Sequence, residues 1–313
     1  MRRILVTGAS GLIGSALVPL LASRGHRVTA TDRTFPADDP RHLDVRSPRQ
    51  VSAALRSVDG IVHLAAVSRV VWGEKNPREC WRTNVTALRH LLSAALDAPT
   101  KPWVLFASSR EVYGDAPHLP AREDTPFAPL NVYGRAKVAG ESLIEEARAA
   151  GLTAGTVRLS NVYGRIDDHA DRVVPAFCRG AARASVLRVE GETNTFDFTH
   201  VDDAVRGILL MTERLARGEP DLPPIHLVTG RGTTLGELAA MAVNASPHSA
   251  TAYLAPHRTF DVARFIGDPT RAAEVLGWKA EISVLQGVRR LVRAFSALGR
   301  VTPRPALSDR KPC

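Results

Sequence analysis

A tyrosine and a lysine stand four residues apart, as Tyr133 and Lys137, at the start of a stretch that we expect to be helical. Positions i and i+4 share one face of a helix, so the phenol and the ammonium group can converge on one site. A nearby ammonium ion favours the phenolate and lowers the pKa of a tyrosine from about 10 toward the range of a general base. The pair therefore predicts a site that removes a proton from a hydroxyl group.

Two serines, Ser108 and Ser109, follow a short apolar run that we expect to form a buried strand. Parallel α/β sheets bind ligands at the carboxyl ends of their strands, so either serine can hydrogen-bond a reacting hydroxyl group there. Serines after a strand are explained equally well as turn residues. Only their combination with the tyrosine and the lysine favours a catalytic site.

A glycine-rich loop follows the first expected strand, with Gly8, Gly11 and Gly14 in the spacing Gly-x-x-Gly-x-x-Gly. The missing side chains let the backbone turn tightly and approach a pyrophosphate at the N-terminus of a helix. Asp32 ends the second expected strand, where a carboxylate can bind an adenosine ribose and repel a 2′-phosphate. The pattern favours NAD over NADP, although the neighbouring Arg33 could accommodate such a phosphate.

Apolar runs alternate with longer amphipathic stretches through the first half of the chain, which predicts βαβ units and a parallel sheet. After about residue 165 the alternation weakens, and we expect a second, smaller lobe. The expected strands are 4–6, 27–30, 61–64, 103–106 and 156–159, and the expected helices are 12–24, 47–57, 77–97 and 133–150.

The composition is that of a globular protein, with 44% hydrophobic and 23% charged residues in 313, which excludes global disorder. Three cysteines, Cys80, Cys178 and Cys313, are too few and too scattered for a disulfide framework or a zinc module. We therefore expect no metal site, and a free thiol at Cys313.

The formal net charge is +9, with 36 arginines and 5 lysines among the 41 basic residues. Such a skew is compatible with nucleic-acid binding, but also with coding bias and solvated arginine faces. We expect no nucleic-acid partner, because no run exceeds two adjacent basic residues.

The uncharged segment 4–23 could be a signal peptide or a membrane anchor. Its glycine-rich break at 7–11 and the later Gly14 and Pro19 argue against both. We expect a cytoplasmic protein that does not bind membranes.

Taken together, a series of ordered motifs resembles the extended short-chain dehydrogenase/reductases, in particular the nucleotide-sugar epimerase/dehydratase family. The resemblance covers about residues 3–298. The motifs are the glycine loop, His63 to Ala66, Asn84, Ser109 to Gly114, Tyr133 with Lys137, Asn161 to Gly164, His200 to Asp203 and Leu276 to Trp278.

This resemblance implies a Rossmann-type, doubly wound parallel sheet that binds NAD and a smaller C-terminal α/β lobe that binds a nucleotide sugar. We assign the NAD domain to residues 1–165, with segments near 196–230 that return to it, and the sugar lobe to 166–300. Family members often form dimers through the helices that correspond to 77–97 and 133–150. Residues 301–313, rich in proline, are expected to be mobile.

By resemblance, Tyr133 would be the base for a sugar hydroxyl, Lys137 would hold the nicotinamide ribose, and Ser109 would orient the sugar oxygen. Asn161 and Arg258 would contact the diphosphate of the substrate. The implied cofactor site comprises Gly8, Gly11, Leu12, Ile13, Gly14, Asp32, Arg33, Asp44, Val45, Leu64, Ala65, Ala66, Asn84, Ala107, Ser108, Tyr133 and Lys137. The implied substrate site also includes Ser68, Arg69, Arg110, Arg172, Val174 and Phe196.

Glu111 departs from simple 4-epimerases of the family, which usually have a small or hydroxylic residue there, and agrees with dehydratases and uronate decarboxylases. Once C4 is a ketone, a carboxylate near C5 could remove the C5 proton. The 4,6-dehydratases have an aspartic acid just before that glutamate, whereas Arg110 cannot donate a proton at neutral pH. Arg110 can instead bind a carboxylate or a diphosphate. An ion pair between Glu111 and Arg110 explains both residues equally well.

Phe196 stands where many relatives have an arginine that contacts the diphosphate. Arg69 and Trp72 are larger than expected in the loop near the sugar, which favours an unusual or acidic sugar. The lost arginine could be replaced by Arg165, Arg172 or Arg188.

Our leading hypothesis is an NAD-dependent nucleotide-sugar 4-epimerase that works through a transient 4-keto intermediate and retains its NAD. The first alternative is a dehydratase, decarboxylase or 5-epimerase that uses Glu111 at C5. A second alternative is a net dehydrogenase or reductase. The alternative from another class is a nonenzymatic protein that binds NAD or nucleic acid.

Overall fold

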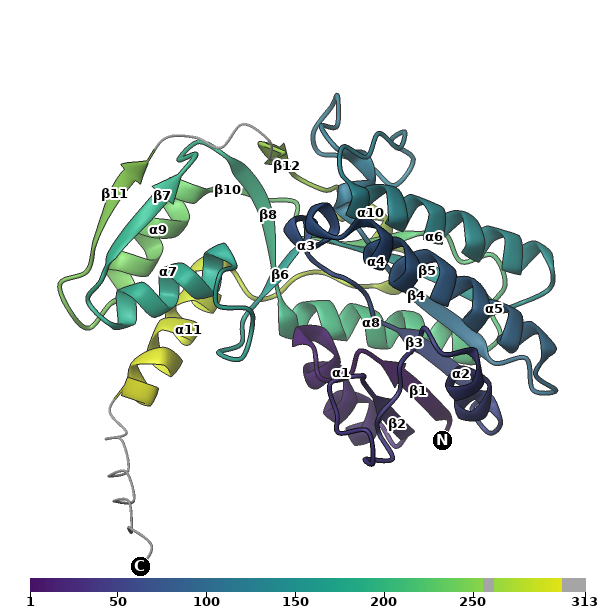
Figure 1. The fold of residues 1–313 in the computed structure, drawn as a ribbon. Helices are drawn as coiled ribbons and strands as arrows, with labels where there is room; N and C mark the ends of the chain where they lie inside the picture. The colour runs from purple at the N-terminus through teal and green to yellow at the C-terminus, as the bar shows by residue number, and fades with distance from the viewer. Residues whose placement is uncertain (256–261, 300–313) are drawn as a thin grey trace, which may run out of the picture.

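The computed structural model describes residues 1–255 and 262–299 (Figure 1). Its larger part contains a central sheet, and its smaller part carries α7, α9 and α11. The expected diphosphate contact Arg258, the terminal Cys313 and the expected mobile tail 301–313 lie outside the described residues.

Six strands form the central sheet, and every neighbouring pair in it is parallel. The order is β2-β1-β3-β4-β5-β9, so the chain builds outward in both directions from β1. A sheet that reverses direction in this way binds ligands at the carboxyl ends of the strands beside the reversal. The predicted doubly wound fold is confirmed. The strands are β1 (Arg3–Thr7), β2 (Arg27–Thr31), β3 (Gly60–His63), β4 (Trp103–Ser109), β5 (Ala154–Leu159) and β9 (Ile225–Leu227).

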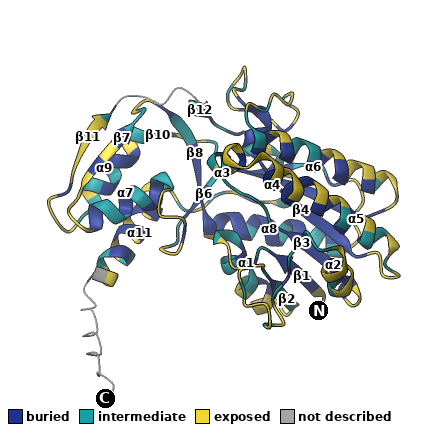
Figure 2. Cartoon of the chain, in the orientation of Figure 1, coloured by how far each residue is buried: buried dark blue, intermediate teal, exposed yellow. Residues whose placement is uncertain are grey.

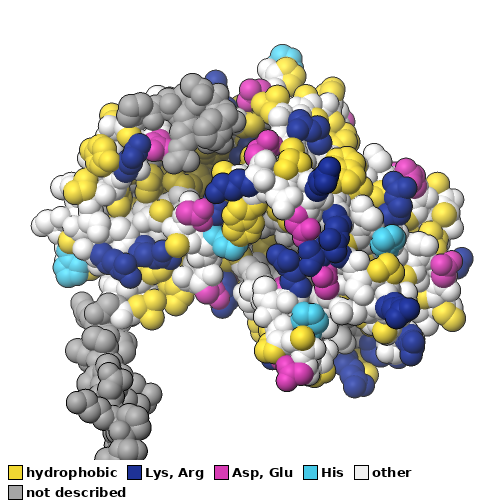
Figure 3. All heavy atoms as spheres, in the orientation of Figure 1, with side chains coloured by type: hydrophobic (Ala, Val, Ile, Leu, Met, Phe, Trp, Pro, Cys, Tyr) yellow, Lys and Arg dark blue, Asp and Glu magenta, His cyan; other side chains and the backbone are white. Residues whose placement is uncertain are grey.

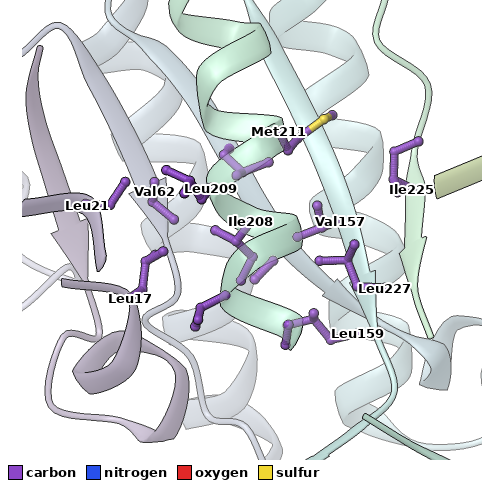
Figure 4. Packing of buried hydrophobic residues seen from close by; sticks show 14 of the residues in the cluster. Leu17, Leu21, Val62, Val157, Leu159, Ile208, Leu209, Met211, Ile225 and Leu227 are labelled. Atoms are coloured by element: carbon purple, nitrogen blue, oxygen red, sulfur yellow. The ribbon is translucent and has the colours of Figure 1, made fainter. Parts of the chain in front are cut away.

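Helices cover both faces of this sheet, and alternate residues of each strand serve opposite faces. Ile4 and Val6 join one hydrophobic core with α1 and α8, whereas Leu5 joins a second core on the other face. Figure 4 shows Leu17 of α1 and Ile208 of α8 in the first core. The two helices on that face are α1 (Leu12–Ser23) and α8 (Val201–Ala216), and those on the other are α2 (Pro48–Leu55), α5 (Ala87–Asp97) and α6 (Val132–Ala149).

Burial on both faces explains why the central strands are continuous apolar runs without alternation. Every residue of β4 and β5 is buried, and Figure 2 shows the dark blue ribbon of β4. Both strands therefore hold fixed positions, and the serines at the end of β4 are carried by a rigid element. Segments 201–216 and 225–227 return to this sheet from later in the chain.

The smaller part has a hydrophobic core of its own, built by three helices and two small sheets. β8 (Thr195–His200) pairs with β6 (Asn161–Tyr163), β10 (Gly232–Thr234) and β12 (Arg264–Phe265), and β7 (Val186–Glu190) pairs in parallel with β11 (Thr251–Ala255). The helices are α7 (Val173–Ala182), α9 (Leu235–Ala245) and α11 (Val284–Gly299).

Between the strands and main helices lie short helical segments that the sequence did not predict separately. The expected helix 77–97 is three consecutive elements, with a π-helical segment at Arg82–Thr86 between α4 and α5. A 3₁₀ helix at Arg110–Tyr113 follows β4 directly. The remaining helices are α3 (Val70–Lys75), α4 (Pro77–Trp81) and α10 (Thr270–Leu276).

The positive charge does not form one continuous patch on the face seen in Figure 3, where Lys and Arg side chains lie at several separate places. Surface arginines such as Arg3 and Arg148 form ion pairs with carboxylates. Within residues 1–255 and 262–299, no helix is both long enough and apolar enough to span a membrane.

Candidate active site

A large cavity of about 930 Å³ lies at the carboxyl ends of β1, β3 and β4 and continues into the smaller part. Its size matches the upper end of small-molecule sites, and its position is the one expected for a doubly wound sheet. The cavity brings together every described residue of the expected cofactor and substrate sites except Asn84.

The glycine loop fits a diphosphate at one end of this cavity. Gly8 has a φ of +72°, and a Cβ atom there would lie 2.7 Å from the backbone nitrogen of Ala65. A Cβ at Gly14 would lie 2.3 Å from the Gly8 oxygen, so helix α1 begins in close contact with the loop. No described side chain caps α1, and its first turn has no acidic residue. Its first N–H groups can therefore bind the diphosphate of a dinucleotide.

Asp32 is held at the same end by hydrogen bonds to its two carboxylate oxygens. Oδ2 accepts from the backbone N–H of Ser10 at 3.2 Å, and Oδ1 accepts from the N–H and hydroxyl of Thr34 at 3.0 Å. Burial alone raises the pKa of Asp32, but these hydrogen bonds outweigh it and the net pKa is lowered. An ionised carboxylate here suits ribose hydroxyls and disfavours a 2′-phosphate. Arg33 lines the same region.

Asp44 lines the cavity, but an arginine that the sequence analysis did not single out binds its carboxylate. Arg46 donates through Nε at 2.8 Å to Oδ1 and through Nη2 at 2.6 Å to Oδ2 of Asp44. The same guanidinium also contacts Glu79. The expected contact of Asp44 with adenine therefore stays a prediction, and Arg46 joins the residues around it. The short Asp-x-Arg spacing was the only signal for it.

Asn84, expected in the cofactor site, does not line the cavity. It lies in the π-helical segment and is buried, with its amide bound to the backbone of Val67. Oδ1 accepts from the N–H of Val67 at 2.8 Å, and Nδ2 donates to its carbonyl at 3.0 Å. π-helical turns are frequent at functional sites. Asn84 therefore positions the cavity-lining loop after β3, and its expected direct role is not supported by this geometry.

Tyr133 stands in the first turn of α6, where the sequence placed it. Asn131 caps the helix by accepting from the N–H of Gly134 at 2.7 Å. Gly134 packs so closely on the 3₁₀ helix that a Cβ there would lie 2.5 Å from the carbonyl oxygen of Glu111. The tyrosine is therefore fixed against the segment that begins at Ser109.

Burial, more than charge, controls the acidity of the two key groups. It raises the pKa of Tyr133 to about 12, while hydrogen bonding with Ser109 lowers it. It lowers the pKa of Lys137 to about 8. Lys137 Nζ donates to the carbonyl of Ala107 at 2.7 Å and lies 5.7 Å from the centre of the Tyr133 ring. The expected net lowering of the tyrosine pKa is thus wrong for the chain alone, because desolvation of the phenolate outweighs the hydrogen bond with Ser109 and the charge of Arg172.

Glu111 and Arg110 form the ion pair that the sequence had left open. Arg110 Nη2 lies 2.8 Å from Glu111 Oε1, and Asn131 Nδ2 donates to Oε2 at 2.8 Å. The N–H of Glu111 donates to Ser109 Oγ at 3.2 Å. Both carboxylate oxygens are therefore occupied, although Glu111 remains close enough to Tyr133 to raise the pKa of the phenol.

A buried polar network lies directly beneath these residues. Ser108 Oγ donates to Glu141 at 2.5 Å, and Arg158 donates to both oxygens of Glu141, the shortest contact being 2.6 Å. Arg158 also reaches the hydroxyl of Tyr113 at 2.5 Å. Ser108 is thus a structural neighbour of the site, and Ser109 is the serine available to a ligand. Removing one partner of such a buried pair costs about 3–5 kcal/mol.

The sugar end of the cavity is closed by side chains from both parts of the chain. Arg69 Nη1 pairs with Asp171 Oδ1 at 2.5 Å, and the Trp72 ring meets the His169 ring edge-on at 4.8 Å between centroids. The same cavity is lined by six residues of the expected substrate site, Ser68, Arg69, Asn161, Arg172, Val174 and Phe196.

The three arginines considered as replacements at Phe196 differ in position. Arg165 does not line the cavity, and Arg188 lines it but is exposed and pairs with Glu190. Arg172 lines the cavity and donates to the Val162 carbonyl at 3.4 Å. Sequence spacing gave no means to rank them. Among the described residues, no cluster of three or more His, Cys, Asp or Glu side chains could hold a metal ion.

A protein-family model, described as the NAD dependent epimerase/dehydratase family, matches residues 4–223. A UDP-glucose 4-epimerase of Lactobacillus helveticus is 30% identical over 305 residues, which cover 88% of this chain and 92% of that protein. UDP-glucuronic acid decarboxylase 1 of Arabidopsis thaliana is 30% identical over 312 residues, which cover 94% of this chain and 69% of that protein.

Solved structures give the same range of relatives. UDP-glucose 4-epimerase of Thermotoga maritima with UDP-glucose matches with a TM-score of 0.86 and 28% identity, over 95% of this chain and 99% of that one. MoeE5 with UDP-glucuronic acid and NAD has a TM-score of 0.84 and 29% identity, over 95% and 99%. The NAD-dependent NDP-hexosamine 5,6-dehydratase TunA has a TM-score of 0.84 and 27% identity, over 95% and 98%.

Proposed function

The chain belongs to the NAD dependent epimerase/dehydratase family, and we propose that it is a nucleotide-sugar 4-epimerase that retains its NAD through each turnover. Membership makes it an enzyme that acts on nucleotide sugars with NAD as its cofactor. The relatives include epimerases, decarboxylases and a dehydratase. The choice among these reactions therefore depends on the side chains around Tyr133.

The residues that fit NAD are the glycine loop, Asp32 and Lys137, and NAD supplies the hydride acceptor and donor for C4 of the sugar. Tyr133 takes up the proton of the C4 hydroxyl, and Ser109 donates a hydrogen bond to the same oxygen. After the 4-keto sugar has turned in the cavity, Tyr133 returns the proton to the C4 oxygen.

The phenolate form of Tyr133 depends on positive charge beside it, because burial raises its pKa to about 12. Lys137 provides that charge from within the same helix, and its Nζ is fixed by the Ala107 carbonyl. Since burial lowers the pKa of Lys137 to about 8, it keeps most of its charge at neutral pH.

The observation that carries the 4-epimerase proposal is the state of Glu111. Oε1 is paired with Arg110 and Oε2 accepts from Asn131, so the carboxylate is fixed in one orientation. Each oxygen keeps a second lone pair, and a base at C5 needs that lone pair to point at the C5 hydrogen in this orientation. Loss of CO₂ from a 4-keto uronate needs no base at C5, so these contacts argue against 5-epimerisation and elimination only. No proton donor stands at position 110, so the elimination of a C6 hydroxyl lacks its acid.

A second candidate is a dehydratase, decarboxylase or 5-epimerase, in which the 4-keto intermediate reacts further at C5. The position of Glu111 favours this candidate. It is buried beside Ser109 and Tyr133, where the decarboxylase and dehydratase relatives would need a carboxylate. Glu111→Gln separates the candidates, because glutamine can still accept hydrogen bonds but cannot remove a proton. Under the first proposal the variant keeps its kcat for C4 epimerisation at saturating substrate, whereas under the second it no longer removes the C5 proton.

The proposal is tested with the enzyme purified with its NAD and a panel of UDP-hexoses and UDP-hexuronates, without added cofactor. We expect a mixture of C4 epimers by anion-exchange chromatography and NMR, with no release of CO₂ and no steady rise of NADH absorbance. Release of CO₂ would instead indicate the C5 alternative. A rise in NADH absorbance proportional to substrate would indicate a net dehydrogenase.

We further propose a homodimer that forms through α4 and α6. Trp81 is 45% exposed on α4, and it lines a shallow groove with Pro77, Val132 and Thr86 and with the arginines at 78, 82 and 135. The exposed surface of this groove is mainly apolar. An exposed tryptophan in such a groove is typical of an interface. We expect Trp81→Glu to convert a dimer into a monomer in light scattering after size exclusion. A wild-type monomer would contradict this assignment.

A further inference from the structure

Arg110 differs from the other described arginines of the cavity in its hydrogen bonding. Its Nη1 is buried and has no hydrogen-bond partner among the described residues. The arginines at 46, 69, 172 and 188 also line the cavity and are paired with carboxylates, and Arg33 lines it as an exposed side chain. None of these five has a buried nitrogen without a partner. An unpaired buried N–H group weakens a fold unless a ligand satisfies it.

The guanidinium of Arg110 is held in place on three sides. Its central carbon lies 5.2 Å from the centre of the Phe196 ring and 5.8 Å from that of Phe265. Glu111 binds one of its edges through Nη2 at 2.8 Å. Stacking on rings uses the faces of a guanidinium and leaves its other edge for hydrogen bonds. The group is thus fixed in advance beside the cavity, and its Nη1 has no partner among the described residues. Because Nη1 is buried, a ligand oxygen reaches it only after a small shift of the side chains around it.

The guanidinium of Arg110 lies at the end of the cavity that contains Ser109 and Tyr133. Arg110 follows Ser109 directly in the 3₁₀ helix after β4, and its partner Glu111 lies close enough to act on Tyr133. Under the proposed function, Ser109 and Tyr133 contact the C4 oxygen of the sugar. A ligand group that meets Arg110 beside them therefore belongs to the sugar.

We propose that Arg110 is the receptor for a carboxylate on the sugar, so that the substrate is a nucleoside-diphosphate uronate and not a neutral hexose. A guanidinium edge and a carboxylate match in plane and spacing, which gives strong, directional hydrogen bonds. A neutral sugar offers only a hydroxyl there. Phe196 contributes by stacking on the guanidinium, where an arginine would repel it. The assignment rests on the proposed function.

The substrate carboxylate and Glu111 would share one guanidinium from different sides. Asn131 also donates a hydrogen bond to Glu111 and so stabilises part of the negative charge of its carboxylate. Glu111 therefore acts as the positioning residue of the pair: it holds Arg110 by one edge while the sugar takes the other.

The test measures equilibrium binding of UDP-glucuronate and UDP-glucose by calorimetry in the NAD-loaded Tyr133→Phe enzyme, whose turnover we expect to be about 10²–10⁴-fold slower than that of the wild type. We expect UDP-glucuronate to bind at least about 30-fold more tightly, since a buried charge-assisted pair discriminates by about 2 kcal/mol or more. Adding the near-isosteric changes Arg110→Met and Glu111→Gln together removes this preference and leaves no lone buried charge.

The exposed Arg122, 68% exposed and paired with Asp124, supplies the matched control: Arg122→Met should leave both affinities unchanged. Equal weakening of both ligands in the double variant would assign Arg110 to the diphosphate and overturn the proposal. Tighter binding of UDP-glucose by the parent would also overturn it. Turnover of the wild-type enzyme is measured separately, so a uronate preference without C4 epimerisation would refute the proposed function while this inference stands.

Discussion

The two ends of the cavity are built in different ways. The dinucleotide end consists mainly of backbone, with glycines that exclude a side chain and a helix start whose N–H groups face outward. The sugar end consists of charged and aromatic side chains from both parts of the chain, most of them in pairs such as Arg69 with Asp171. The comparison teaches that the cofactor end is defined by local geometry, and the substrate end by contacts between distant segments.

The largest expected effect separates chemistry from cofactor binding. Tyr133→Phe should lower kcat by about 10²–10⁴-fold, because it removes the proton-transfer group, and should leave bound NAD unchanged. The measurement is turnover together with the NAD content of the purified variant. Loss of bound NAD together with activity would show that Tyr133 contributes to cofactor binding as well as to catalysis.

The next effect concerns the cofactor end. Gly8→Ala should weaken NAD binding by about 10–100-fold, since a Cβ would lie 2.7 Å from Ala65 nitrogen at a positive φ. Gly25→Ala is the matched control, because Gly25 also has a positive φ, +79°, but nothing lies within 4 Å of its Cβ position. NAD content after dialysis distinguishes the two. Equal loss in both variants would contradict a role for the close contact at Gly8.

Sequence reasoning was more reliable at the cofactor end for the same physical reason. Glycine spacing, a strand end and a carboxylate such as Asp32 are local features, and their geometry follows from one βαβ unit. The orientation of Asn84 was harder to predict, because the sequence indicates a continuous helix. In the structure a π-helical segment turns this side chain toward Val67.

At the sugar end, the relevant partners are far apart in the chain. Residue types alone did not place Phe265 against Arg110 or His169 against Trp72. The ion pair between Arg110 and Glu111 was one of several open explanations, since neighbouring side chains in a loop can point in different directions. The prediction that the pKa of Tyr133 is lowered was also wrong, because the sequence shows the lysine four residues away but not the desolvation of the phenol.

A smaller effect should appear in the pH dependence of stability. The pKa of Lys137 is lowered by burial from 10.5 to about 8, so between these values the unfolded chain binds the proton that the folded chain has released. The folded state is therefore stabilised as pH rises through this window. Relative to Lys137→Met, the wild-type melting temperature should increase from pH 8 to 10. A difference in melting temperature between the two proteins that stays constant from pH 8 to 10 would contradict a lowered pKa of Lys137 in the folded state.

The smallest expected effect is at the rim of the sugar end. Asp171 is 65% exposed, and solvent screens its pair with Arg69. Asp171→Asn should therefore change KM by less than about 5-fold, because exposed ion pairs contribute about 0–1 kcal/mol. Steady-state kinetics measure this directly. A loss of more than 100-fold would show that this contact belongs to the substrate site itself.

The most direct test of the central claim is turnover of UDP-glucuronate in D₂O by the enzyme with its own NAD, followed by proton NMR at C4 and C5. The account predicts the C4 epimer with protium kept at both carbons, because hydrogen at C4 leaves and returns without exchange and C5 is never deprotonated. Deuterium at C5 of the hexuronate would contradict it and assign proton removal at C5 to Glu111. A decarboxylated pentose product would also contradict it, because it would show that the 4-keto acid loses CO₂ before hydride returns to C4.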